Sequence, residues 1–206
     1  AFIDAGVEAG YPGTKDYNGE HQEGFGPMHM TVRNGVREST ARAYLKPIMH
    51  RSNLTILTNA LVHHIEFAEN RAIGIRLEIG GTSKSIHAGR ELLLTAGAIA
   101  SPMLLQRSGI GSEEILNTAG IKIIHNLCGV GENLQDHAGP PMAWQMTSRR
   151  SSINHQLTPL GLARNAITYA LSRSGVLSMP AATVGIFARS HQQAAGQICS
   201  FTACPS

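Results

Sequence analysis

The sequence is poor in features that mark several classes of protein. Only 15% of its 206 residues are charged and 5% are aromatic, and Trp144 is the single tryptophan. Nucleic-acid-binding proteins combine a basic surface with aromatic side chains on which bases stack. The 17 Lys and Arg residues are instead scattered along the chain. We therefore predict no nucleic-acid partner.

Cysteine and long apolar runs are scarce as well. Cys128, Cys199 and Cys204 show no CxxC spacing, and the ten histidines form no HxH or HExxH pattern. We therefore expect free thiols and no metal site. No run approaches the ~18 apolar residues of a membrane-spanning helix, and the N-terminus lacks the regions of a signal peptide. These absences predict a cytoplasmic protein and leave peripheral association with the inner membrane open.

Glycine is abundant, with 22 residues, and it separates a mixture of helical and strand-like patterns. Strands are predicted at 53–57, 60–67, 72–79, 83–88, 91–95, 121–125, 142–147 and 185–188. Helices are predicted at 39–49, from Ser101-Pro102 up to Gly109, at 112–119 and at 159–173. The alternation within 60–67 places one ring of His63-His64 toward the core and the other toward solvent. The order of elements predicts an α/β fold of the mixed α+β kind.

The sharpest local transition lies in ELLLTAGAIASPMLLQRSGIG, residues 91–111. An apolar segment turns at Ala96-Gly97 directly into a helix. Such a turn is typical of nucleotide sites, because glycine lets a ligand approach the backbone and the first N–H groups of a helix attract phosphate. Many α/β turns look alike without a ligand, so both interpretations stand at this point. Neither Gly109-Ile110-Gly111 nor Gly129-Val130-Gly131 completes a GxGxxG loop.

The order of the motifs resembles the glucose–methanol–choline family of FAD-dependent oxidoreductases. GAIASPMLLQRSGIG at 97–111, followed by GVGENLQDH at 129–137, is similar to two of its motifs. The resemblance continues upstream in DYNGEHQEGFG (16–26), NGVREST (34–40), ARAYLKP (41–47) and NLTILTNALVHHI (53–65). SGVLSMP (174–180) and IFARS (186–190) fit more loosely. The resemblance therefore covers nearly the whole chain.

This resemblance implies an interleaved architecture. Part of a Rossmann-like FAD-binding domain would alternate with part of a substrate domain built on an antiparallel sheet. By position, residues 1–30 belong to the substrate domain, 31–137 to the FAD-binding domain, and 138–206 to the substrate domain again. The family's N-terminal GxGxxG loop has no counterpart in these 206 residues. The same holds for its C-terminal segment, which carries the catalytic histidine and a histidine or asparagine partner. We therefore expect an internal piece of such an enzyme, which by itself holds FAD weakly and does not turn over.

The resemblance also implies roles for individual residues. Val62 matches the position whose main chain meets the adenine of FAD, and Ala96 and Gly97 would lie beside the adenosine. Asn133 and Asp136 would bind the cofactor from the loop that passes toward the flavin. His137 follows on the same loop as the catalytic candidate, either in proton transfer or as a hydrogen-bonding support.

The activity implied is oxidation of an alcohol, with hydride passing to the flavin while a base takes the hydroxyl proton. A lyase of the same family and a non-catalytic fragment are the alternatives. Choline-oxidising relatives carry a glutamate two residues after the matching histidine, where this chain has Gly139. A buried cation without a counter-charge is costly, so we expect a neutral primary alcohol as substrate. The electron acceptor, oxygen or a quinone, and a homo-oligomeric state stay open.

Overall fold

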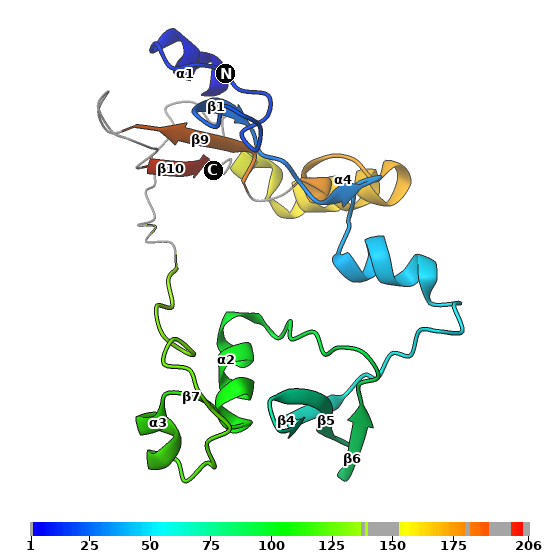
Figure 1. Ribbon diagram of the computed structural model, residues 1–206. Coiled ribbons are helices and arrows are strands. Elements are labelled where there is room, and N and C mark those ends of the chain that lie inside the picture. The colour runs from blue at the N-terminus through cyan, green and yellow to red at the C-terminus, as the bar shows by residue number, and fades with distance from the viewer. Residues whose placement is uncertain (1, 137–138, 140–152, 180–181, 190–198, 204–206) are drawn as a thin grey trace. The chain divides into compact units, whose positions relative to one another are not determined.

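The computed structural model describes residues 2–136, 139, 153–179, 182–189 and 199–203 (Figure 1). The chain divides into two compact units. The first comprises Ala1–Arg51 and Met142–Ser206, and the second comprises Ser52–Pro141. The second unit is thus inserted, along the sequence, between the two parts of the first.

The first unit is organised around a three-stranded antiparallel sheet in the order β1-β9-β10. Strands β1 (Gly24–Pro27) and β10 (Cys199–Ala203) both pair with β9 (Val184–Ala188). The ring of Tyr17 stacks on that of Phe187 with centroids 5.2 Å apart. Helix α1 (Phe2–Glu8) packs against β1. The sheet therefore joins the N-terminal and C-terminal parts of the sequence.

Short elements complete the described part of this unit. They are β2 (Val32–Arg33), β3 (Val36–Arg37), the π-helical η1 (Ala41–Leu45), the 3₁₀ turns η2 (Lys46–Ile48), η4 (Ile153–Gln156) and η5 (Val176–Ser178), and helix α4 (Pro159–Ser172). The helix predicted at 39–49 is replaced by η1 and η2, because Pro47 has no N–H with which to continue an α-helical ladder. The helix predicted at 159–173 is confirmed. Its first turn is capped by the Thr158 side chain, which accepts from the Gly161 N–H at 3.3 Å.

The second unit contains an antiparallel meander in the order β4-β5-β6, formed by β4 (Ala60–Ala68), β5 (Arg71–Ile79) and β6 (Thr82–His87). Gly80 and Gly81 both adopt positive φ, 57° and 76°, which suits a two-residue hairpin turn. Ile65 and Leu77, 4% and 2% exposed, anchor the core of the meander. Strand β4 lies at the edge of this sheet and packs against helix α2 (Gly97–Arg107).

A smaller group of elements follows α2 in the chain. Strands β7 (Ile110–Gly111) and β8 (His125–Asn126) form a parallel pair, and helix α3 (Glu113–Thr118) lies between them in sequence. Leu116 of α3 is completely buried. Helix α3 begins after Ser112 and is followed by Gly120 in a left-handed conformation, as the sequence predicts.

Several strand predictions are wrong in whole or in part. Residues 53–57 and 91–95 form no strand, and the strand predicted at 121–125 is reduced to β8. A strand exists only where a neighbour accepts and donates its hydrogen bonds. The two apolar segments pair with no strand in the part of the chain that is described. The strand predicted at 142–147 lies outside the described residues.

Two local expectations also need correction. Helix α2 begins at Gly97 rather than near Ser101, so that Pro102 lies inside the helix. The turn at Ala96-Gly97 brings the chain directly into helical conformation, and the missing N–H of Pro102 removes one bond from the second turn. His63 and His64 are both half-buried, because a β-bulge between Val62 and His64 interrupts the alternation of side chains.

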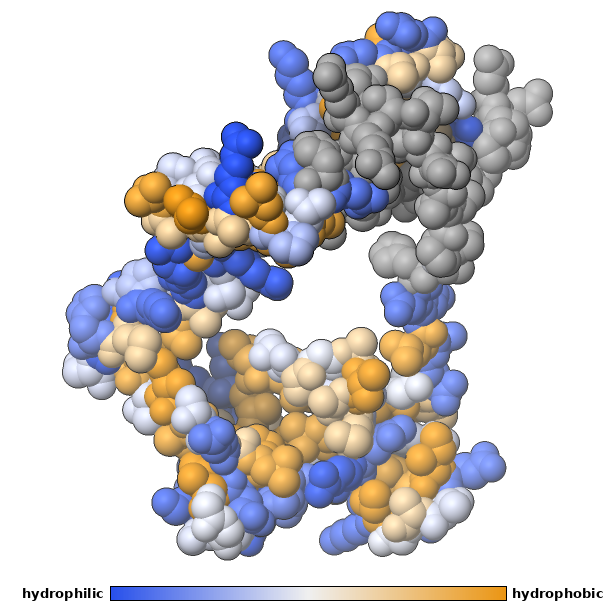
Figure 2. All heavy atoms as spheres, turned by 180° about the vertical axis from the view of Figure 1, so that it is seen from behind, coloured by the Kyte–Doolittle hydropathy of each residue, from blue (hydrophilic) through white to orange (hydrophobic). Residues whose placement is uncertain are grey.

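Figure 2 shows hydrophobic residues at the surface among hydrophilic ones. In the second unit, Leu93 is 77% exposed and Ile99 is 72% exposed, and these two residues flank the turn at Ala96-Gly97 in sequence. The surroundings of that turn are therefore open and partly apolar. Among the described residues, no helix has the length and apolar character needed to cross a bilayer.

Candidate cofactor site

The turn from residue 96 into α2 leaves open space at the helix N-terminus. Gly97 has φ +90°, and a Cβ built on it meets no atom within 4 Å. An L-residue adopts this φ only with strain, so glycine is the residue that suits the turn. The N-cap residue is Ala96, which makes no side-chain capping hydrogen bond. The first N–H groups of an uncapped helix are available to an anion, phosphate included.

The hairpin between β5 and β6 shows toward which neighbouring strand the main-chain N–H and C=O groups of each residue in the meander point. A two-residue hairpin makes Ile79 and Thr82 a hydrogen-bonded pair. Since backbone groups alternate along a strand, the odd-numbered residues of β5 near this turn face β6. The N–H of Ala88 donates to the carbonyl of Ile73 at 2.8 Å, in agreement with this direction. The even-numbered residues of β5 therefore face β4.

This alternation puts the main chain of Val62 on the outer edge of β4. Leu61 is opposite Glu78 and Glu66 is opposite Gly74, so Leu61 and Glu66 exchange hydrogen bonds with β5. Their neighbours in β4, Val62 and Ile65, then face away from β5. Val62 and Ile65 are three positions apart, and in a regular strand their main-chain groups would face opposite edges. The extra residue of the bulge at His63 restores them to the same edge.

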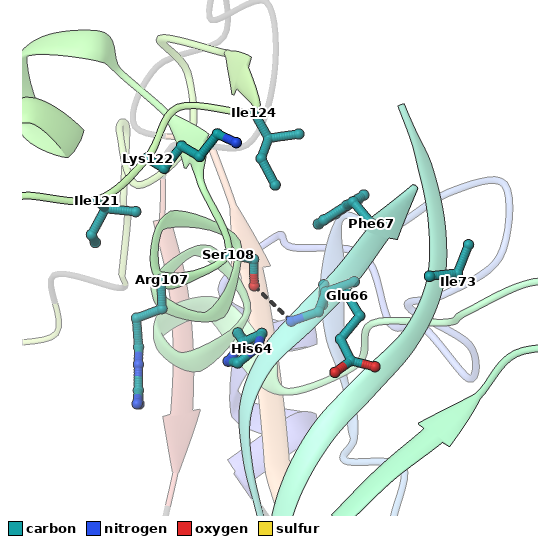
Figure 3. A pocket seen from close by; sticks show the side chains of 10 residues that line it. His64, Glu66, Phe67, Ile73, Arg107, Ser108, Ile121, Lys122 and Ile124 are labelled. Carbon is teal, nitrogen blue, oxygen red and sulfur yellow. Dashed lines mark hydrogen bonds between the residues drawn. The ribbon is translucent and has the colours of Figure 1, made fainter. Parts of the chain in front are cut away.

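Ser108 ties this edge to the end of helix α2. Its side chain is buried, with 6% of the residue exposed, and it accepts a hydrogen bond from the N–H of Ile65 at 2.8 Å (Figure 3). The same hydroxyl donates to the carbonyl of Leu104, one helical turn earlier, at 2.6 Å. The outward-facing N–H of Ile65 is thereby satisfied by a side chain instead of a neighbouring strand.

The glycine loop after β8 is attached to the same helix. The side-chain amide of Gln106 donates to the carbonyl of Val130 at 3.1 Å. Asn133 adopts φ 58°, a left-handed conformation that asparagine tolerates, and both Asn133 and Asp136 are exposed. His137, the catalytic candidate, lies outside the described residues.

The predicted cofactor residues therefore fall on three connected elements of one unit. Val62 is on β4, Ala96 and Gly97 are at the start of α2, and Asn133 and Asp136 are on the loop held by α2. The contacts through Ser108 and Gln106 were not predicted from the sequence. The sequence signal that could have pointed to these contacts is the position of the polar residues Gln106 and Ser108 after the apolar run of α2.

An open hollow of about 590 Å³ lies beside the contact between Ser108 and Ile65 (Figure 3). His64 and Glu66 reach it from β4, Arg107 from the end of α2, and Lys122 from the segment before β8. Arg76 Nη2 donates to the Glu66 carboxylate at 2.8 Å and Ser85 Oγ at 2.9 Å. The hydrogen bond from Arg76, and then that from Ser85, lower the pKa of Glu66 from its usual 4.5. These contacts favour the ionised carboxylate and make Glu66 a structural partner of Arg76 and Ser85.

Comparison with known proteins shows the family to which the chain belongs. Residues 1–139 match the family described as GMC oxidoreductase, which confirms the resemblance seen in the motifs. The chain is 56% identical over 137 residues to an oxygen-dependent choline dehydrogenase of Photobacterium profundum. That alignment covers 66% of this chain and 24% of the relative, so the chain spans about a quarter of the length of the curated proteins it matches.

Solved structures agree with the predicted fold class. An FAD-dependent oxidoreductase from Chaetomium thermophilum is 28% identical with a TM-score of 0.78, covering 90% of this chain and 33% of that one. Pyridoxine 4-oxidase from Mesorbium loti is 36% identical with a TM-score of 0.63, covering 66% of this chain and 27% of that one. The prediction of a mixed α/β chain related to FAD-binding oxidoreductases is confirmed.

Proposed function

Because the chain belongs to the GMC oxidoreductase family, we propose that the complete protein is an FAD-dependent enzyme that oxidises the CH–OH group of a small alcohol. The match of residues 1–139 to the family carries this proposal. FAD is the cofactor associated with this family and, when bound, supplies the hydride acceptor. The relatives described above are named as a dehydrogenase, an oxidoreductase and an oxidase, and the lyase alternative finds no support among them.

We assign the adenosine end of FAD to the second unit. We assign Val62 to the adenine, because its main-chain N–H and C=O face the outer edge of β4 and an adenine ring presents both an acceptor and a donor. Ala96 and Gly97 lie beside the adenosine and pyrophosphate, where an open turn and uncapped helical N–H groups favour a phosphate. Asn133 and Asp136 hold the cofactor from the exposed loop.

The segments are assigned to domains accordingly. Residues 31–137 belong to the FAD-binding domain, and 1–30 with 138–206 belong to the substrate domain. The sheet that pairs β1 with β9 supports the second assignment, because it unites residues from both ends of the sequence in one antiparallel sheet. His137, at the junction of the two kinds of segment, is assigned to the reacting alcohol as a hydrogen-bonding or proton-transferring group.

Two features bear on the choice of alcohol. The relatives' name points to choline, whereas Gly139 leaves the position two residues after His137 without a carboxylate. The family match ends at residue 139 and so lies mostly outside the predicted substrate-domain segments. We therefore assign a neutral primary alcohol as substrate, with choline as the alternative outcome of the test below.

Anaerobic reduction of the flavin tests this function. The purified full-length protein is mixed without oxygen with ethanol, benzyl alcohol or choline, and the absorbance of oxidised flavin is followed. Loss of that absorbance on addition of an alcohol is the expected result. A protein that retains flavin but leaves it oxidised with every alcohol contradicts the proposal, and conversion of a cyanohydrin without flavin reduction identifies a lyase.

A further inference from the structure

Ser108 is the buried polar residue of the described core, and its hydroxyl connects two parts of the chain that are 43 residues apart. One hydrogen bond goes to Leu104 within α2 and the other comes from Ile65 in β4. The bond to Leu104 fixes the orientation of the hydroxyl, so that its lone pair is directed at the strand. A single buried side chain thus links the outer edge of β4 to the end of α2.

The N–H of Ile65 points toward Ser108 only because of the bulge in β4. Ile65 and Val62 face the same outer edge, since the extra residue at His63 shifts the alternation between them. The hydroxyl of Ser108 therefore acts on the edge that presents the main chain of Val62, three residues away. At its other end, α2 carries the Ala96-Gly97 turn. The two elements joined by Ser108 are the two that carry the proposed adenosine contacts.

We infer that Ser108 is a positioning residue for the adenosine end of the cofactor. Its hydroxyl sets the position of the β4 edge relative to α2, and so the spacing between the Val62 main chain and the N-terminal turn of the helix. This role rests on the proposed function, because it requires that the adenosine part of FAD is bound by these two elements. Ser108 itself is buried beneath the edge and need not touch the cofactor.

The test uses ADP as a probe for the adenosine end. The affinities of full-length apoprotein for ADP and for FAD are measured by calorimetric titration, for the wild type and for Ser108→Ala. Alanine leaves the Ile65 N–H without its partner, and the edge of β4 is no longer held at its position. We expect both affinities to fall by the same factor, about tenfold, which corresponds to about 1.4 kcal/mol.

Two controls separate positioning from general stability. Thr118→Ala removes a hydroxyl that makes the same kind of bond to a helical carbonyl, Glu114 at 2.8 Å, on the exposed surface of α3. Leu116→Val removes volume from the fully buried side chain of α3 and lowers the melting temperature of the apoprotein without changing the link to β4. Neither control is expected to change the affinity for ADP.

The outcomes are distinct. Loss of ADP and FAD affinity in Ser108→Ala, but not in Leu116→Val at equal or greater loss of melting temperature, supports the positioning role. Affinities that follow melting temperature through all variants overturn it, as does a Ser108→Ala protein that binds like the wild type. Ser108→Cys has a similar size and keeps a weaker acceptor for the Ile65 N–H and a weaker donor to the Leu104 carbonyl. It is expected to give a smaller loss and serves as the test if the alanine variant does not fold. A wild-type protein that binds neither FAD nor ADP overturns the proposed function itself.

Discussion

At the scale of single residues, the open space at Gly97 leads to a comparison of two glycines. Gly97 and Gly10 have nearly the same φ, +90° and +93°, and at both an added Cβ meets no atom within 4 Å. Alanine at either position therefore carries the same strain, about 1–2 kcal/mol. Only at residue 97 does the methyl group also enter the space proposed for the cofactor.

We predict that Gly97→Ala and Gly10→Ala lower the melting temperature of the full-length apoprotein by similar amounts. FAD affinity is expected to fall about tenfold or more in Gly97→Ala, because the methyl group occupies the approach to the helix N-terminus. It should be unchanged in Gly10→Ala. Flavin titration and thermal unfolding measure the two effects, and equal FAD affinity in both variants would show that the turn at residue 97 is purely structural.

Glu66 gives a prediction on pH. Its pKa is lowered in the folded state by Arg76 and then by Ser85, so the unfolded chain takes up the proton first as the pH falls. The stabilisation by the ionised carboxylate is therefore present above the ordinary pKa of 4.5 and is lost progressively below it. We expect Glu66→Gln to be less stable than the wild type at neutral pH and to lose less stability on acidification. Melting temperatures between about pH 3 and pH 7 measure this difference in stability. Glu69→Gln, in the exposed turn after β4, is the charge-matched control. Parallel curves of melting temperature against pH for Glu66→Gln and the wild type would contradict the prediction.

Local features of single residues could be predicted from the sequence, whereas contacts between distant residues could not. The Ala96-Gly97 turn could be predicted, because a glycine between an apolar run and a helix is a local pattern. Ser108 could not, because the residue it binds is 43 positions away and a serine near a helix end has many other uses. Asp136 and Asn133 could be placed on a loop from their glycine neighbours, while their proposed roles came only from the resemblance.

At the scale of elements, the bulge in β4 decides which edge Val62 faces. A strand of regular alternation would direct Val62 and Ile65 to opposite edges. Deleting one of the two adjacent histidines, His63 or His64, removes the extra residue and leaves the rest of the meander sequence intact. The main chain of Val62 would then face β5, or the strand would shift its register and turn its apolar side chains to the other face.

We predict that the deletion variant loses measurable ADP affinity, whereas His63→Ala keeps it. The substitution retains chain length and bulge and removes only the imidazole, whose Nε2 lies 3.4 Å from the Glu78 carboxylate in a half-exposed pair of small energetic weight. Titration with ADP measures the affinity, and circular dichroism verifies that strand content is kept. Wild-type ADP affinity in a folded deletion variant would refute the assignment of Val62 to the adenine.

The meander itself was predictable, and the bulge was not. Alternating apolar residues and the Gly80-Gly81 pair identify β4, β5 and β6 with boundaries close to those observed. A bulge adds a single residue and has no sequence requirement that the pair His63-His64 could reveal. The apolar segments 53–57 and 91–95 were mistaken for strands because a short apolar run is typical of a strand, whereas a strand also needs a hydrogen-bonded neighbour, and neither segment has one among the described residues.

At the scale of the whole molecule, the resemblance supplied what composition could not. Length, glycine content and element order are compatible with many mixed α/β proteins. The ordered motifs pointed to one family, and the match over residues 1–139 confirms it. The first unit is built from two separate parts of the sequence, Ala1–Arg51 and Met142–Ser206, while the assignment of 31–137 to an FAD-binding domain stays a prediction.

The charge of the preferred substrate is the property of the proposed full-length enzyme on which Gly139 bears. Gly139 is exposed, and an added Cβ meets no described atom within 4 Å, so a glutamate fits there without strain from positive φ. A carboxylate near a quaternary ammonium supplies a few kcal/mol at the dielectric of a partly buried site, and each 1.4 kcal/mol is about tenfold in affinity.

We predict that the full-length enzyme oxidises neutral primary alcohols with higher kcat/KM than choline, and that Gly139→Glu shifts the ratio toward choline by about tenfold or more. Gly139→Gln, of equal size and no charge, should leave the ratio unchanged. Steady-state rates with 3,3-dimethylbutanol, the neutral isostere of choline, and with choline itself give the ratio without a difference in shape. A native enzyme that already prefers choline over this isostere would show that another residue supplies the counter-charge and that position 139 does not determine specificity.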